Sequence, residues 1–131
     1  MELIVQTQRK TQLVDITAQL QRQIEGAGIQ GGICMVYVPH TTAAVTINES
    51  ADPDVRSDIE MVMDKLVPWK DGYRHLEGNS AAHVKSTLVG VSEFIAVRDG
   101  RLVLGTWQGV FFCEFDGPRT RKVHWHVISR E

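Results

Sequence analysis

The sequence lacks any apolar run close to the roughly 20 residues that a membrane-spanning helix needs. Its first residues, Met1 to Gln6, also lack the basic stretch and long apolar segment of an export signal. We therefore expect a cytoplasmic protein that has no membrane partner. Basic residues are not in excess, because the formal net charge is -2, so we expect no broad nucleic-acid-binding surface.

Linkers, repeats and cysteines are scarce as well. There is no low-complexity tract, no internal repeat that can be aligned and no linker rich in Pro, Gly and Ser. At 131 residues the chain has the commonest size of one domain, and we predict a single domain over residues 1–131. The only two cysteines, Cys34 and Cys113, lie in apolar, strand-like runs, which predicts reduced thiols in the core.

The apolar pattern predicts a mixture of strands and helices. It indicates a helix over residues 13–27, a second that starts at Asp52-Pro53-Asp54 and runs to about Val67, and a third that Asn79 caps and Gly90 ends. Strands are expected over 2–7, 31–39, 44–48, 91–97, 101–104, 109–115 and 120–128. Because the helices do not alternate strictly with the strands, we predict an α+β domain with a mainly antiparallel sheet and about three helices.

Polar side chains follow the two predicted strands in the middle of the chain. His40, Thr41 and Thr42 come after the first, and an imidazole with two hydroxyls can bind a metal, a phosphate or a water. Asn48 and Glu49 close the next strand and would lie beside His40 if the two strands paired as a hairpin. The alternatives are a turn whose Thr hydroxyls bond the backbone, and a solvated Glu.

Four more histidines are candidate metal ligands. His75 lies in a loop and His83 in the first turn of the third helix, where a cation opposes the helix dipole, so a neutral or metal-bound imidazole is favoured over a charged, exposed one. His124 and His126 alternate with Trp125 on a terminal strand. Both can bind metal, but we favour a solvent-facing side of that strand.

Two further segments carry candidate ligand contacts. The segment Gly105-Thr106-Trp107-Gln108-Gly109 has the wrong glycine spacing for a dinucleotide loop, but its backbone can approach a ligand. Arg119 ends the turn Asp116-Gly117-Pro118-Arg119, where a guanidinium can bind a phosphate, with Arg121 and Lys122 adding positive potential. A solvated turn with internal Asp–Arg pairing explains the same residues equally well.

Taken in order, these segments resemble the YjbQ family over nearly the whole chain. The resemblance rests on His40-Thr41-Thr42-Ala43-Ala44, Asn48-Glu49, Asp52-Pro53, Tyr73-Arg74-His75, Asn79, Ala82-His83, Leu104-Gly105-Thr106-Trp107-Gln108 and Asp116-Gly117-Pro118-Arg119. It implies a compact α+β subunit of a homotrimer, an active site near subunit boundaries and a bound divalent metal. It also implies a secondary thiamine-phosphate synthase activity, which couples a pyrimidine diphosphate to a thiazole phosphate and releases pyrophosphate.

From the chemistry of the implied reaction we assign roles to the candidate residues. Its metal, zinc or magnesium, would bind to His40, His75 and His83. Glu49 would be a metal-water or proton partner and Arg119 would neutralise the departing pyrophosphate. Thr41, Thr42, Asn48, Gln108 and Arg119 would contact a small phosphorylated metabolite. Two other readings are a non-catalytic trimeric module that binds the same metal and metabolite, and metal-assisted hydrolysis near Glu49.

Overall fold

The computed structural model describes residues 1–129 and divides them between two antiparallel sheets and three helices. The larger sheet has the strand order β1-β8-β3-β5-β6 and the smaller has β2-β7-β4. In chain order the elements are β1 (Glu2–Gln6), β2 (Gln12–Asp15), α1 (Thr17–Gly26), β3 (Gly31–Tyr37), β4 (Ala43–Glu49), α2 (Pro53–Leu66), α3 (Ser80–Val89), β5 (Ser92–Arg98), β6 (Arg101–Leu102), β7 (Gln108–Glu114) and β8 (Thr120–Ser129). The predicted α+β class and antiparallel pairing are confirmed.

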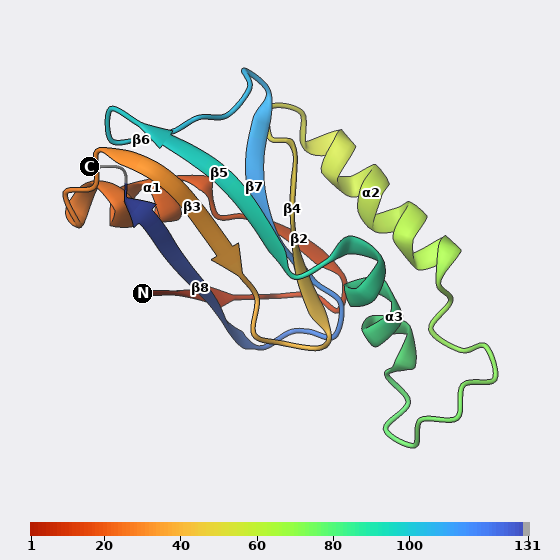
Figure 1. The fold of residues 1–131 in the computed structure, drawn as a ribbon. Coiled ribbons are helices and arrows are strands. Elements are labelled where there is room, and N and C mark those ends of the chain that lie inside the picture. The colour runs from red at the N-terminus through yellow and green to blue at the C-terminus, as the bar shows by residue number, and fades with distance from the viewer. Residues whose placement is uncertain (130–131) are drawn as a thin grey trace.

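The smaller sheet is covered on both faces. One face joins α1 and the inner side of the larger sheet in a core that includes Leu20, Val36, Phe112 and Trp125. On the other face, Phe111 and its buried neighbours pack with residues of α2 and α3. Figure 1 shows these two helices on the side of the smaller sheet that faces away from the larger one. Strand β7 is consequently buried along nearly its whole length, as a continuous apolar run predicts.

The prediction of a helix over residues 13–27 is wrong at its beginning. Residues 12–15 form β2, and α1 starts only at Thr17. Leu13 lies opposite Cys113 on β7 and is buried there, so its apolar contacts lie on a sheet. Asp15 ends the strand, because its Oδ1 accepts a hydrogen bond from the Thr17 amide at 2.9 Å. The helical spacing of Leu13 was therefore a coincidence.

Two predicted helix caps have different outcomes. Asp52 caps α2 by accepting a hydrogen bond from the Asp54 amide at 2.9 Å, which confirms the prediction. Asn79 occupies the capping position of α3, but its side chain makes no capping hydrogen bond, so the predicted cap is wrong. Both cysteines are buried free thiols. Within residues 1–129, no helix is long and apolar enough to cross a membrane.

Three connections between the sheets lie together at one edge. The chain passes from the larger sheet to the smaller at residues 7–11 and 38–42, and returns at 115–119. Backbone hydrogen bonds join these connections: the Thr7 amide donates to the Arg119 carbonyl, and the Phe115 amide donates to the Thr42 carbonyl. Residues as far as 112 positions apart in the sequence are thereby held at one location, and the candidate site lies there.

Candidate anion-binding site

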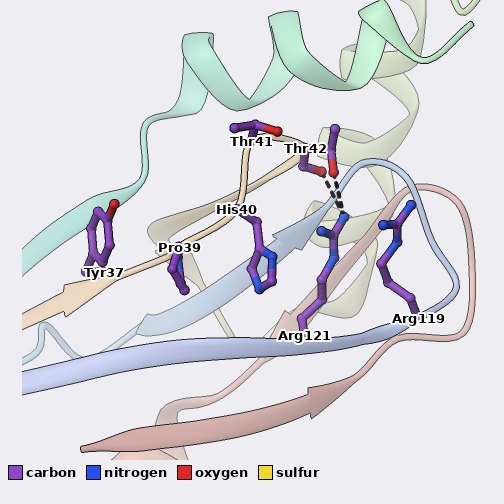
Figure 2. Close-up of a pocket in the computed structure, with 7 residues that line it drawn as sticks. All are labelled: Tyr37, Pro39, His40, Thr41, Thr42, Arg119 and Arg121. Atoms are coloured by element: carbon purple, nitrogen blue, oxygen red, sulfur yellow. Dashed lines mark hydrogen bonds between the residues drawn. The ribbon is translucent and has the colours of Figure 1, made fainter. Parts of the chain in front are cut away.

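A polar cavity of about 460 Å³ opens where the connections meet (Figure 2). We call it the arginine pocket, and it is lined by Tyr37, Pro39, His40, Thr41, Thr42, Arg119 and Arg121. Five of these residues come from the end of β3 and the connection that follows it, whereas Arg119 ends the returning connection and Arg121 lies at the start of β8. The cavity therefore places two guanidinium groups opposite an imidazole and two hydroxyls.

Arg121 is fixed by a buried carboxylate. Its side chain is 2% exposed and that of Glu114 is fully buried. Arg121 Nε donates to Glu114 Oε1 at 2.9 Å, and Nη2 donates to the other oxygen of Glu114 and to Thr42 Oγ1 at 2.9 Å. Nη1 makes no hydrogen bond within residues 1–129. Arg121 thus lines the pocket in a fixed orientation with one donor nitrogen uncommitted.

Glu114 holds its charge because donors surround it. Burial raises its pKa, but the hydrogen bonds from Arg121, from the Asp116 amide and from the Thr7 hydroxyl lower it, and the net pKa lies below the ordinary value. The Thr7 hydroxyl also accepts a hydrogen bond from the Arg119 amide at 2.9 Å. One buried carboxylate therefore organises both arginines.

Arg119 is the more exposed of the two arginines, with 47% of its side chain accessible. Its Nε donates to the Asp116 carbonyl at 2.9 Å and its Nη2 to Asp116 Oδ2 at 3.0 Å. The internal Asp–Arg pairing is therefore present, and Arg119 also lines the arginine pocket. Its remaining guanidinium nitrogen has no partner among residues 1–129.

His40 contributes a neutral imidazole. Burial lowers its pKa below the ordinary value, and the positive charge of Arg121 lowers it further. His40 Nε2 accepts a hydrogen bond from the Lys122 amide at 3.0 Å. A neutral ring that accepts at Nε2 carries its proton on Nδ1, so its second nitrogen is a hydrogen-bond donor.

A second cavity of about 510 Å³ shares Tyr37, His40 and Thr41 with the first and includes His83. The rings of His75 and His83 meet edge to face, with centroids 5.5 Å apart. His40 thus lies between the arginine pocket and this cavity. In the part of the chain that the structure describes, no group of three metal-binding side chains is assembled, so the His75–His83 pair is the part of the proposed metal set that the fold brings together.

The other candidate residues lie elsewhere. Strands β3 and β4 belong to different sheets, so the hairpin that would place Glu49 beside His40 does not form. Glu49 pairs with Gln108 at the far end of β4. It is six residues from Ala43, the first residue of the strand, and the rise of a strand makes that separation roughly 20 Å. Asn48 precedes Glu49, its Oδ1 accepts a hydrogen bond from the Glu49 amide, and it does not line the arginine pocket. Within one chain, Asn48, Glu49 and Gln108 form a separate polar group.

Sequence reasoning treated Arg121 only as a source of positive potential and did not identify Glu114. A signal was available for both. Arg121 alternates with the buried Val123 and Trp125 on β8, which places a charge on the buried face of that strand. Glu114 ends a buried run on β7. Two opposite charges at inward positions predict a buried ion pair, since a lone buried charge is strongly disfavoured.

Comparison with known proteins shows which family this chain matches. The family model described as "UPF0047 protein YjbQ-like" matches residues 1–130. The chain is 50% identical to UPF0047 protein YugU of Bacillus subtilis, over 91% of each chain, and 49% identical to UPF0047 protein MJ1081 of Methanocaldococcus jannaschii, over 95% of this chain and 91% of the relative. A crystal structure of a YjbQ/UPF0047 family protein from Clostridium acetobutylicum superposes with a TM-score of 0.94 at 47% identity, covering 98% of this chain and 99% of that one. None of these descriptions names a reaction.

Proposed function

Because the chain belongs to the UPF0047/YjbQ-like family, whose description names no activity, we propose from the site itself that it binds a phosphorylated metabolite in the arginine pocket. The observation that carries the proposal is Arg121, a buried guanidinium that Glu114 fixes in the wall of an open polar cavity. Arginine presents its donors in a planar fork that matches phosphate oxygens. The carboxylates of Glu114 and Asp116 do not line the cavity, so they orient the arginines without occupying it.

We propose further that the bound group is the diphosphate of a substrate and that the reaction is of the thiamine-phosphate synthase type. In such a coupling, negative charge accumulates on the departing pyrophosphate, and donors fixed before the reaction stabilise that charge. Arg119, Arg121 and the Nδ1 proton of His40 are donors of this kind. The Thr41 and Thr42 side chains complete the wall, although the Thr42 hydroxyl is already committed to Arg121.

The proposed divalent metal would bind at His75 and His83. Two adjacent imidazoles suit zinc better than magnesium, which prefers oxygen ligands. Bound there, a metal would add positive charge for phosphate oxygens. His40 could join them only by giving up the hydrogen bond from the Lys122 amide, because its Nε2 accepts that bond and its Nδ1 carries the ring proton. Elemental analysis of protein purified without a metal-affinity tag tests this: stoichiometric zinc that His83→Ala loses supports the pair, and wild-type protein that takes up none contradicts it.

A homotrimer remains our proposal for the assembly. Its support is the outer face of the larger sheet, which no helix of the described chain covers and which exposes Ile33, Phe94 and Ile128. Contiguous apolar surface of this kind is typical of subunit interfaces. We expect light scattering to give the mass of three chains and Phe94→Glu to lower it. A stable wild-type monomer would refute the proposal.

One observation favours the alternative of a binding module without turnover. The proposed proton partner, Glu49, lies at the far end of β4, and no carboxylate from residues 1–129 lines the arginine pocket. If a second subunit does not supply such a group, the pocket can hold a phosphorylated ligand without a base to assist its reaction. Product analysis after incubation with a pyrimidine diphosphate and a thiazole phosphate separates the two readings, since only an enzyme releases pyrophosphate.

The phosphate proposal is tested by titrating the protein with pyrophosphate in a calorimeter at fixed salt. We expect Arg119→Ala to weaken binding by about tenfold or more, and Arg119→Lys to recover only part of the loss, since it keeps the charge but not the fork. Arg101→Ala is the matched control, because Arg101 is 74% exposed and, among residues 1–129, its only ion pair is with Glu25 at 3.9 Å. Equal affinity of wild type and Arg119→Ala would refute the proposal.

A further inference from the structure

Asn79 uses its side chain in an unexpected way. It stands at the position that caps α3, yet it makes no capping hydrogen bond. Its Nδ2 instead donates to Asp116 Oδ2 at 2.9 Å, a residue 37 positions further along the chain. The same carboxylate oxygen accepts Arg119 Nη2 at 3.0 Å. Asn79 and Arg119 therefore meet on one oxygen of Asp116.

This orientation of the Asn79 side chain destabilises the fold, because it buries an unpaired polar atom. Asn79 Oδ1 is buried and has no hydrogen-bond partner within residues 1–129. Turning the amide over would bring Oδ1 against the Asp116 carboxylate, so that two acceptors would face each other. A serine in the same place could cap the helix without burying an amide oxygen. Stability of α3 alone therefore does not explain why the side chain points at Asp116.

The hydrogen bond between Asn79 and Asp116 connects the first turn of α3 to the turn that carries Arg119. The Asn79 carbonyl accepts backbone hydrogen bonds from Ala82 at 3.0 Å and His83 at 3.4 Å, in the first turn of α3. Its side chain holds the turn that carries Arg119. Arg119 is nearly half exposed, and a long side chain with that exposure keeps one orientation only if it is anchored. Asp116, with 18% of its side chain exposed, is that anchor, and Asn79 holds Asp116.

We propose that Asn79 is a positioning residue that acts through Asp116 to fix the Arg119 guanidinium at the arginine pocket, and that it thereby links the helix bearing His83 to the phosphate contact. The proposal rests on the proposed phosphate-binding function. It assigns Asn79 no direct contact with the ligand, because its free oxygen is buried.

Two substitutions separate positioning from folding. Asn79→Ser keeps a good capping residue but is too short to reach Asp116, so we expect an unchanged thermal midpoint and pyrophosphate binding weakened roughly three- to tenfold, the scale of one hydrogen bond. Asn79→Asp places a carboxylate next to Asp116 and should weaken binding further. Gln19→Ala, which removes a single amide hydrogen bond to the Ile4 carbonyl, is the matched control and should have no effect.

A double variant shows whether Asn79 acts through Arg119. In an Arg119→Ala background, Asn79→Ser should change pyrophosphate affinity less than about twofold, since the residue that it positions is absent. A full effect of Asn79→Ser in that background, or none in wild-type protein, would overturn the proposal. If Arg119→Ala alone has no effect, the phosphate-binding function fails instead.

A measurement without ligand tests the positioning role of Asn79 independently of the proposed phosphate binding. The Nε–H resonance of Arg119, assigned by its loss in Arg119→Lys, reports the hydrogen bond to the Asp116 carbonyl. We expect Asn79→Ser to shift and broaden that resonance while Gln19→Ala leaves it in place. An unchanged resonance in Asn79→Ser overturns the positioning role, whatever the protein binds.

Discussion

Replacing Glu114 by Gln removes the negative charge that compensates Arg121 and keeps the size of the side chain. The two Glu114 oxygens together accept hydrogen bonds from the Thr7 hydroxyl, the Asp116 amide and two nitrogens of Arg121. In either orientation, the amide group of Gln would turn a donor toward two of these donors. Because both charges are buried, we expect Glu114→Gln to lower the free energy of unfolding by about 3–5 kcal/mol at neutral pH.

The loss should depend on pH in a defined direction. The folded-state pKa of Glu114 is lowered, so its ionisation stabilises the fold fully above the ordinary value of 4.5 and ceases to do so as the pH falls through the folded pKa. Below pH 4.5 the wild-type protein therefore loses the contribution that the variant never had, and the difference between them should shrink. Glu25→Gln is the control, because it makes the same chemical change at a half-exposed carboxylate whose ion pair with Arg101 is 3.9 Å long.

Urea unfolding, followed by the fluorescence of the buried Trp125 at fixed protein concentration, measures the effect. With an m-value of about 1–3 kcal/mol/M, the midpoint should fall by roughly 1–5 M at neutral pH. A loss below about 1 kcal/mol, or one that stays constant down to pH 3.5 or so, would refute the account of the buried pair. Joint replacement by Arg121→Met and Glu114→Leu should recover most of the stability and still abolish pyrophosphate binding, which would separate the pair's function from folding.

Further predictions concern the turn, the thiols and the helix layer. Gly117→Ala should weaken both stability and pyrophosphate binding, because its Cβ would clash with the Arg9 carbonyl oxygen of the first connection. Unchanged urea and calorimetric titrations would contradict this. Burial raises the pKa of Cys34 to about 11 and that of Cys113 to about 12. A disulfide reagent at pH 8 or so should therefore label neither thiol until urea unfolds the chain. Rapid labelling of the native protein would be inconsistent with this packing. Lys85 is buried and pairs with the half-exposed Asp64. In urea unfolding, Lys85→Met should lower the free energy of unfolding by roughly 1–2 kcal/mol less than Lys85→Ala, because Met keeps the buried aliphatic stem of the side chain. Equal losses would show that this stem contributes nothing.

Most elements of this fold could be predicted because their signals are local. Asp52 and Pro53 mark the start of α2 in the sequence alone, and the apolar run of β7 is a strand in either sheet. The error at Leu13 has a physical cause, since one apolar side chain satisfies helical and strand spacing equally well until its partner is known. That partner, Cys113, is 100 positions away. The division of the strands into two sheets likewise depends on which strands pair, and the periodicity of a single strand does not reveal its partner.

The candidate site was predicted only in part for the same reason. His40 and Arg119 do meet at one cavity, but Glu49 does not, because β3 and β4 follow each other in the chain and still belong to different sheets. Polar residues at strand ends indicate where chemistry is placed, whereas their grouping depends on which ends meet. The buried carboxylate that organises the arginines is invisible to such reasoning, since it ends an apolar run and resembles an exposed strand end. A search for opposite charges on inward positions of different strands would have found Glu114 and Arg121, and it would have placed the site at the connections between the sheets.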